Sequence, residues 1–224
     1  SADITSKEFL FKHHELISDA ANLKIYSYEN KEVVFQTDNY RSHIDFKTRK
    51  GHFVSNGDVS EIFFVKNEFK TEASDFYWDP IDKDIIRIKW DDPYAGTDIN
   101  KTPARELVDM TTIGNELIAT NPEKKGLKFN ALTASFNFSD NIIHAEGVRF
   151  INVGDAALIP YDGKLTIHEK AVIEKLNYAR LVAGRENKYH ELYNVIATVN
   201  SGEDFRGSGD YDYIDENQTI QKIH

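Results

Sequence analysis

Apolar and polar residues alternate along much of this chain, in short runs separated by polar turns. In the stretch DIIRIKW, Ile86, Ile88 and Trp90 share one face, while Arg87 and Lys89 occupy the other. Because the side chains of a strand point alternately to opposite faces, such a run predicts a strand with one buried face. The sequence therefore predicts a mostly β protein whose strands are about five residues long.

The same alternation recurs in four further stretches. SHIDFKTRKGHFV places Ile44 and Phe46 on one face and predicts a turn near Gly51. Within GLKFNALTASFNF, NIIHAEGVRFINV and ELYNVIATV, the predicted inward residues are Leu127, Phe129, Ala131, Phe136, Phe138, Ile143, Ala145, Val148, Phe150, Tyr193, Val195, Ala197 and Val199. Short strands joined by tight turns stack into a β-solenoid or an elongated β-jellyroll, which is the fold that we expect.

Helix signals are few, and we expect at most one or two short helices. Thr102 and Pro103 precede ARELVDM, and a capping residue followed by proline predicts one or two helical turns. The segment 168–184 fits two structures. Its apolar spacing and terminal Gly184 suit a helix, whereas its small residues at alternate positions suit short strands.

Length and charge limit the organisation and the partners. The 224 residues can bury a sufficient core, and we expect one elongated β domain over residues 1–224, with a sub-boundary placed near 95–115. The final TIQKIH stops inside an alternating run, which predicts a piece of a longer chain. A net charge of −10 without a basic stripe argues against nucleic acid as a partner. The absence of cysteine excludes thiol catalysis and thiolate metal sites.

The first candidate site is SDFYWDPIDKDIIRIKWDDPYAG, where aromatic residues stand among aspartates. Aromatic rings stack on sugars and carboxylates accept hydrogen bonds from hydroxyls, so Tyr77, Trp78, Trp90 and Tyr94 are candidate glycan-binding residues. Paired carboxylates in the same stretch would suit glycoside cleavage. The competing interpretation, which the sequence favours, is that both tryptophans belong to the core and that DP and DDP mark turns.

The second candidate site is FRGSGDYDYIDENQ, where Asp210, Asp212, Asp215 and Glu216 offer oxygen ligands for calcium. An EF-hand order is absent, because the third acid comes one residue late and no glycine follows it. On a strand, the two tyrosines would point away from the first two aspartates, and the preceding glycines would form the turn before the strand. We therefore prefer a strand with a polar face, and we expect no cofactor.

Three stretches carry a family resemblance: GLKFNALTASFNFSDNIIHAEGVRFINVGDAALIPYDGKLTI, KYHELYNVIATVNS and GSGDYDYIDE. They resemble a family of large exported envelope proteins of Bacteroidetes with repeated short-strand segments, over about residues 30–224. The strand pattern is also similar to OstA-type lipopolysaccharide-transport domains, whose strands form a β-jellyroll with an apolar groove. The resemblance implies strands over 168–184 and an exported protein of the periplasm, the outer membrane or the cell surface. It implies no catalytic residues.

We therefore expect a structural or binding segment of an exported cell-envelope protein, without catalytic activity. Its expected partners are other domains of the same longer chain, together with glycan, lipid or another envelope protein. One alternative is a carbohydrate-active β-helix enzyme, a glycoside hydrolase or lyase. Another is a lipid or lipopolysaccharide groove of the OstA type, lined by Phe46, Phe53, Phe64, Phe129 and Phe136. The same phenylalanines would form a closed core if the chain is a scaffold.

Overall fold

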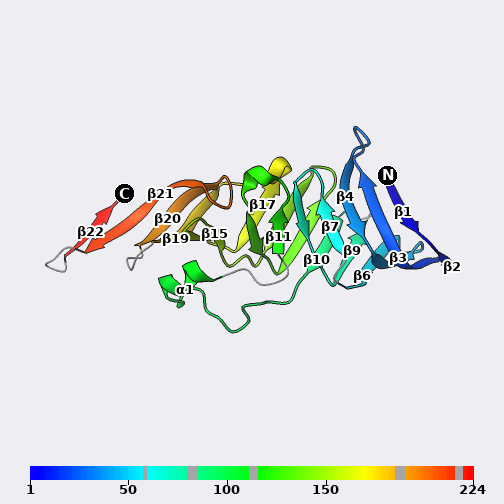
Figure 1. Cartoon of the computed structure of the whole chain (residues 1–224), viewed down its shortest axis with the longest axis horizontal. Coiled ribbons are helices and arrows are strands. Elements are labelled where there is room, and N and C mark those ends of the chain that lie inside the picture. Colours follow the sequence, from blue (N-terminus) through cyan, green and yellow to red (C-terminus); the bar gives the residue numbers. More distant parts are fainter. Residues whose placement is uncertain (58–59, 80–84, 111–115, 185–189, 215–218) are drawn as a thin grey trace.

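The computed structural model describes residues 1–57, 60–79, 85–110, 116–184, 190–214 and 219–224. The molecule is elongated, and the two termini lie at opposite ends of its long axis (Figure 1). The prediction of a mostly β protein is confirmed. The described residues form strands, one α-helix, α1 (Ala104–Asp109), and two short 3-10 helices, Pro122–Lys124 and Glu169–Ala171. No described helix is long and apolar enough to cross a membrane.

The larger of two antiparallel sheets has the strand order β12-β11-β8-β7-β4-β3-β5-β6-β9-β10-β13-β14-β17-β18, and β1 and β2 pair with β3. Its strands are β1 (Ala2–Ser6), β2 (Leu10–Lys12), β3 (Glu15–Tyr26), β4 (Val33–Asp38), β5 (Tyr40–Asp45), β6 (Lys50–Ser55), β7 (Glu61–Phe64), β8 (Phe69–Thr71), β9 (Asp75–Asp79), β10 (Ile85–Lys89), β11 (Glu116–Ala119), β12 (Lys128–Asn130), β13 (Thr133–Asn137), β14 (Ile142–Glu146), β17 (Lys164–His168) and β18 (Val172–Ile173).

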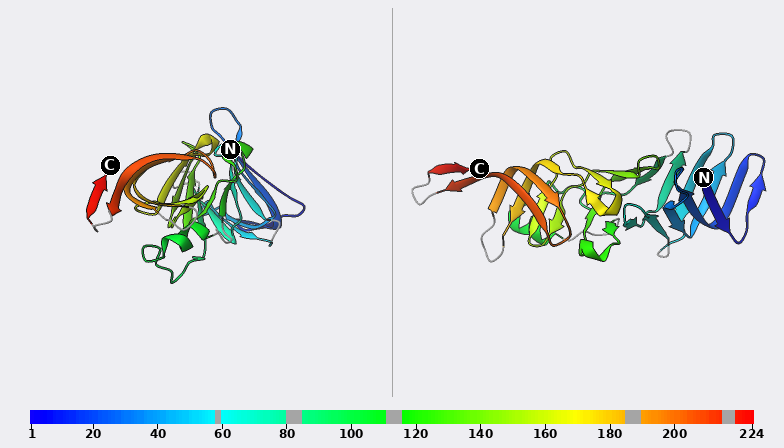
Figure 2. Two further views of the ribbon diagram at one scale, coloured as in Figure 1. Left: turned by 60° about the vertical axis from the view of Figure 1, so that its left-hand side comes forward. Right: turned by 90° about the horizontal axis from the view of Figure 1, so that it is seen from above.

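The smaller sheet has the order β15-β16-β19-β20-β21-β22. Its strands are β15 (Ile151–Val153), β16 (Ala156–Ile159), β19 (Leu176–Ala183), β20 (His190–Val199), β21 (Phe205–Ile214) and β22 (Ile220–Ile223). Figure 2 shows the last two strands extending beyond the rest of the molecule at the C-terminal end. All four residues of β22 are exposed, so this strand is an open sheet edge within the described structure.

The larger sheet doubles over on itself around an aromatic core. Phe35 on β4 contacts Phe76 on β9 with ring centroids 5.7 Å apart, and Phe64 on β7 contacts Phe136 on β13 at 5.3 Å. Several strands separate the partners of each pair in the sheet order, and each adds about 4.8 Å in a flat sheet. Only a doubled sheet brings these rings together. All four are fully buried, and both pairs meet edge to face, a geometry that stabilises aromatic contacts.

A buried asparagine ties the two layers together along one edge. Asn67 lies in the β7–β8 turn, and its Nδ2 donates to the backbone oxygens of Asn141 (2.7 Å) and Ile167 (3.0 Å). The backbone N–H of Ala171 donates in return to the Asn67 carbonyl at 2.9 Å. These three partners belong to the opposite layer or adjoin it, so Asn67 acts as an interlayer clamp.

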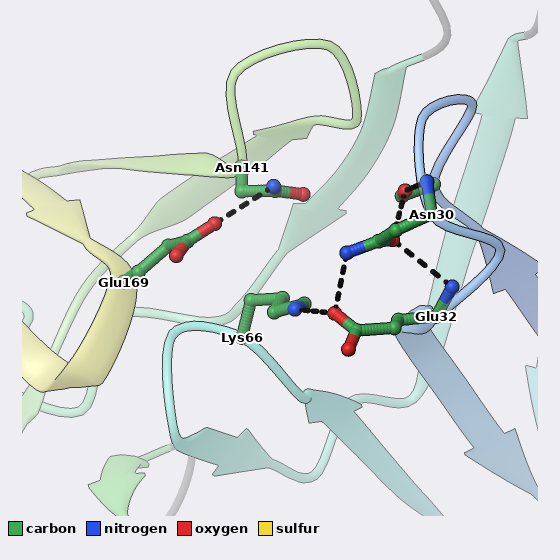
Figure 3. Close-up of polar contacts among 6 residues, drawn as sticks. Asn30, Glu32, Lys66, Asn141 and Glu169 are labelled. Carbon is green, nitrogen blue, oxygen red and sulfur yellow. Dashed lines mark hydrogen bonds and ion pairs between the residues drawn. The ribbon is translucent and has the colours of Figure 1, made fainter.

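Exposed polar contacts surround this clamp (Figure 3). Lys66 forms an ion pair with Glu32, whose carboxylate also accepts a hydrogen bond from Asn30 Nδ2 at 2.6 Å. On the other side, Asn141 Nδ2 donates to Glu169 at 3.0 Å. Exposed ion pairs contribute little to stability, about 0–1 kcal/mol each, so the buried asparagine makes the larger contribution here.

The turn predicted near Gly51 is present, but Gly51 itself is not part of it. The β5–β6 turn consists of residues 46–49, and Gly51 lies inside β6. Arg49 provides the positive φ of the turn, at 58°. A Cβ on Gly51 would lie 2.8 Å from the Phe53 ring, so this position requires glycine for packing and not for turning. Phe46 is consequently 50 % exposed and not inward-facing.

The segment 168–184 forms a 3-10 turn followed by β18 and β19, and not a helix. β19 pairs with β16 on one side and β20 on the other, and these hydrogen bonds favour the extended form over a helix. The helix expected after Pro103 is confirmed, but its capping is not. Pro103 occupies the N-cap position, and Thr102 Oγ1 donates to the Asp98 carbonyl at 2.9 Å.

Residues 91–103 and α1 pack on the smaller sheet. The helix lies against β16 and β19, and Leu107 is fully buried. This second core cluster comprises Tyr94, Ile99, Leu107, Phe150, Ala157, Ile159 and Val182. The segment thus belongs with the smaller sheet. The sub-boundary near 95–115 stays a prediction, because residues 111–115 lie outside the described structure.

Candidate glycan-binding groove

A groove of about 740 Å³ lies on the outer face of the larger sheet, over β9, β10, β13 and β14. Its volume is within the range of small-molecule sites, roughly 300–1,000 Å³. Tyr77 and Trp90 both line it, as do polar side chains from all four strands, which include Asp75, Arg87, Lys89, Ser135, His144 and Glu146. The structure therefore brings two of the four predicted aromatic residues together in one groove.

Tyr77 forms the aromatic wall of this groove. Its side chain is 52 % exposed, and its ring stacks on His52 with centroids 4.3 Å apart and planes at 3°. His52 Nε2 lies 2.9 Å from a carboxylate oxygen of Asp75, which fixes the orientation of the imidazole. Since His52 on β6 covers one face of the ring, the face turned toward β10 borders the groove. Stacking and a hydrogen-bonded neighbour thus hold this tyrosine in place.

Trp90 has a different role. It follows β10, is 5 % exposed, and its Nε1 donates to the Glu72 carbonyl at 2.8 Å. Its backbone N–H donates to the Leu132 carbonyl at 2.9 Å. Trp90 is therefore a core residue, as the structural interpretation expected, and it also lines the groove; its role in glycan binding stays a prediction.

Trp78 and Tyr94 lie elsewhere. Trp78 is on the inner face of β9 and packs against the core, and its Nε1 is buried without a hydrogen-bond partner among the described residues. Tyr94 is buried against Phe150, with ring centroids 5.3 Å apart, and its hydroxyl donates to Asn130 at 3.3 Å. Alternation explains the separation of Trp78 from Tyr77, because adjacent residues of a strand face opposite ways.

The groove contains both signs of charge. The carboxylates are Asp75, Asp91 and Glu146, and the permanent cations are Arg87 and Lys89. Carboxylates accept hydrogen bonds from hydroxyls, while Arg, Lys, Ser and Thr side chains donate to ring and hydroxyl oxygens. A ligand with many hydroxyls and an apolar ring face matches this lining. Within the described residues, no three His, Asp or Glu side chains converge as metal ligands.

The acidic run places Asp210 and Asp212 on β21. Hydrogen bonds from Asn194 Nδ2, at 2.8 Å, and from the His224 ring, at 2.6 Å, lower the pKa of Asp210. The hydroxyl of Tyr193 donates to Asp212 at 2.7 Å, and this bond raises the pKa of the phenol to about 12. Both carboxylates thus bond to side chains of the same sheet. The calcium prediction stays a prediction, because its residues 215 and 216 lie outside the described structure.

The two glycines before these acids do not form the predicted turn, because they lie inside β21. A Cβ on Gly207 would lie 2.8 Å from the Ile196 carbonyl oxygen, and one on Gly209 would lie 2.7 Å from Val195 Cγ2. The backbones of β20 and β21 approach closely here. These positions therefore need glycine because two backbones approach closely there, and not because the chain turns.

The phenylalanines of the lipid alternative are mostly interior. Phe53, Phe64, Phe129 and Phe136 are fully buried in one core cluster, and Phe46 lies apart from them on the exposed β5–β6 turn. Interiors packed in this way have few voids larger than a water molecule. A lipid chain would have to separate these rings to bind among them.

Several groove residues were not identified from the sequence. Arg87, Ser135 and His144 come from strands spread over about sixty residues, and His52, which supports Tyr77, comes from an earlier strand; they meet only through long-range strand pairing. Alternation assigns each of them to an outer face, and this is the signal that the sequence contains. It does not say which strands are neighbours, so the groove could not be assembled from it.

Comparison with known proteins adds no family assignment: no family model, curated protein or solved structure matches this chain.

Proposed function

We propose that this chain is a binding segment of an exported cell-envelope protein, an elongated β-jellyroll whose outer face holds carbohydrate. The groove at Tyr77 is the observation that carries the proposal. It joins an exposed aromatic ring, held by His52 and Asp75, to hydrogen-bond donors and acceptors on three further strands. Polar groups that converge beside an aromatic wall are typical of ligand sites.

Carbohydrate fits this lining better than other common ligands. The aliphatic face of a pyranose stacks on a tyrosine ring, and its hydroxyls bond to carboxylates and cations together. Nucleic acid would meet three carboxylates in the groove and a chain of net charge −10. A purely apolar ligand would displace water from the groove's charged groups and offer them no hydrogen bonds in return, which costs free energy.

The scaffold role rests on the doubled sheet and its open edges. Phe35, Phe64, Phe76 and Phe136 fill the interior, so the outer faces and the strand edges remain for contacts. At the C-terminal end, Ile220 and Ile223 of β22 are exposed on an edge that pairs with no further strand among the described residues. Such edges pair with further strands, which suits a partner that is another domain of a longer chain or another envelope protein.

The lipid alternative keeps one supporting observation. Phe11 is exposed on β2 and Phe46 on the β5–β6 turn, and the Phe46 N–H donates to the carbonyl of His14, which follows β2, at 2.7 Å. An apolar patch at this edge would suit an acyl chain or a membrane surface. Binding of lipid vesicles that is lost on Phe46→Ser, with Tyr77→Ala binding them as the unsubstituted protein does, would favour this alternative.

Titration calorimetry with neutral oligosaccharides tests the carbohydrate proposal. Tyr77→Ala should weaken binding by about tenfold or more, since it removes the stacking ring, and tenfold corresponds to about 1.4 kcal/mol. Tyr213→Ala is the matched control, because Tyr213 is an exposed tyrosine on the smaller sheet. Equal affinities of the two variants would refute the site. Cleavage of the bound oligosaccharide would favour the enzyme alternative instead.

A further inference from the structure

We infer that the Tyr77 groove is one end of a longer track, which crosses the outer face of the larger sheet and binds a neutral linear glycan in extended form. This inference rests on the proposed function and adds the shape, length and charge of the ligand. Its far end is a pair of exposed tyrosines, Tyr161 and Tyr178, that sequence analysis did not identify.

The strand register forms a continuous outer row. Tyr77 lies directly opposite Arg87, Arg87 opposite Ser135, Ser135 opposite His144, and His144 opposite Thr166. Directly opposed residues of antiparallel strands point to the same face, so these five side chains share the outer surface. The row begins at the aromatic wall of the groove and continues beyond it onto β17.

A second groove of about 390 Å³ lies next to the first, on the side of β17. It is lined by Lys164 and Thr166 of β17, and these two residues are the register partners of Glu146 and His144, which line the first groove. Lys164 Nζ also forms an ion pair with Glu146 at 3.1 Å. The two hollows therefore adjoin across the β14–β17 ladder, and the second extends from β17 to residues 176–178 of β19 in the smaller sheet.

Tyr161 and Tyr178 stand at the far side of the second groove. They are 80 % and 68 % exposed, and their rings meet at 63° with centroids 6.4 Å apart. A third groove of about 490 Å³, lined by both tyrosines, adjoins the pair. Two large rings exposed between two polar hollows form a stacking platform for sugar.

The backbone at Tyr178 is held in an uncommon conformation. Its φ is +56°, and the β19–β20 register shifts between Leu176 and Ala179. A β-bulge of this kind redirects a side chain, and positive φ costs free energy for an aromatic residue. Such strained positions cluster at binding sites, and here the bulge presents the ring to the groove.

Length and charge define the ligand. From β9 to β17 the sheet has four interstrand steps, which span about 19 Å at the usual strand spacing. Each step is close to the length of one pyranose unit, so an extended glycan places one sugar over each strand. Carboxylates outnumber permanent cations in the first groove, and the chain is strongly acidic. Over the three grooves together, carboxylates and permanent cations are equal in number, so the track has no excess of cations for an acidic glycan and suits a neutral one.

The test is calorimetry with three neutral linear series, the cello-, chito- and manno-oligosaccharides, from the disaccharide to the hexasaccharide. For the preferred series, affinity should rise by about tenfold or more with length and level off once the track is filled. Tyr178→Ala and Tyr161→Ala should abolish this gain and leave disaccharide binding unchanged. Tyr77→Ala should weaken every length, and Tyr213→Ala should change none.

The outcomes separate the inference from the proposed function. If the disaccharide binds in a Tyr77-dependent way but longer chains gain nothing, the track is refuted and the groove remains. If length improves binding and Tyr178→Ala and Tyr161→Ala have no effect, the chain follows another path and the inference is refuted. If no oligosaccharide of the three series binds, both proposals fail. Circular dichroism of each variant shows that a loss does not come from unfolding.

Discussion

Replacement of Asn67 by alanine tests whether the doubled sheet depends on its interlayer clamp. The Asn67 amide bonds the carbonyls of Asn141 and Ile167, which lie 74 and 100 residues further along the chain. These are among the few polar contacts that join the β7–β8 turn to the opposite layer. Removal of the amide leaves both carbonyls without this donor, the Ile167 carbonyl at a buried position and the Asn141 carbonyl at a partly buried one.

The expected cost follows from these two bonds. A net hydrogen bond contributes about 1 kcal/mol, and a buried acceptor left unsatisfied costs roughly 1–3 kcal/mol. The Oδ1 atom of Asn67 has no hydrogen-bond partner within the described structure, so its removal adds nothing to the loss. We therefore expect Asn67→Ala to lower the free energy of unfolding by about 2–4 kcal/mol, a large fraction of the usual 5–15 kcal/mol.

Urea unfolding followed by tryptophan fluorescence measures this loss. Both tryptophans, Trp78 and Trp90, lie in or directly beside strands of the larger sheet, so the signal reports the part that the clamp holds. Asn67→Asp keeps the shape and removes the amide donor, so it should cost at least as much. Glu169→Ala, which removes only an exposed contact to Asn141, should cost within about 0.5 kcal/mol. A loss below about 1 kcal/mol for Asn67→Ala would refute the reasoning.

Two further predictions concern the segment around β14. Gly147 has a φ of +73°, and a Cβ there would lie 2.5 Å from Leu132 Cγ. Gly147→Ala should therefore reduce the free energy of unfolding by about 1–3 kcal/mol and lower the melting temperature in calorimetry. An unchanged melting temperature would contradict this. Partial burial tends to raise the pKa of Asp92, but its ion pair with Arg149 prevails and holds the pKa below the usual value. Its contribution to stability is therefore present above about pH 3.9 and is lost as the pH falls through the lowered folded pKa. Asp92→Asn should be less stable than the unsubstituted protein at neutral pH, and urea midpoints of the two should converge in acid; a constant difference at all pH values would refute the ion pair's role.

The sequence predicted which side chains are buried far better than how the strands are arranged. Ile86, Ile88, Phe129 and Phe136 are inside as expected, because alternation follows directly from strand geometry. The doubling of the sheet depends on pairings such as that between β4 and β7, and a periodic pattern contains no information about partners. The turn predicted near Gly51 lies at residues 46–49, and Gly51 itself is in β6, because the sequence does not distinguish a glycine that allows close packing from one that allows a turn.

For the candidate site as well, the sequence predicted the residue types but not their positions in the fold. Tyr77 and Trp90 were selected by residue type and both line the groove, whereas Trp78 and Tyr94 were selected in the same way and do not. The difference lies in which face and which layer each side chain occupies. The exposure of the Tyr178 ring depends on a β-bulge, and the sequence has no glycine or other turn residue that would predict this bulge. Only the structure could therefore identify Tyr178 as a candidate.

One register determines both the core and the outer surface of the larger sheet. Phe53 is opposite Phe76 on the inner face, and the same pairing sets His52 opposite Tyr77 on the outer face. Core packing therefore fixes the spacing of the outer side chains without contacting a ligand itself. Because exposed positions of a strand tolerate substitution at small cost, the outer row can change its ligand while the aromatic interior keeps the fold. This separation is what a binding scaffold requires, and it is the physical reason for proposing the outer face as the binding surface.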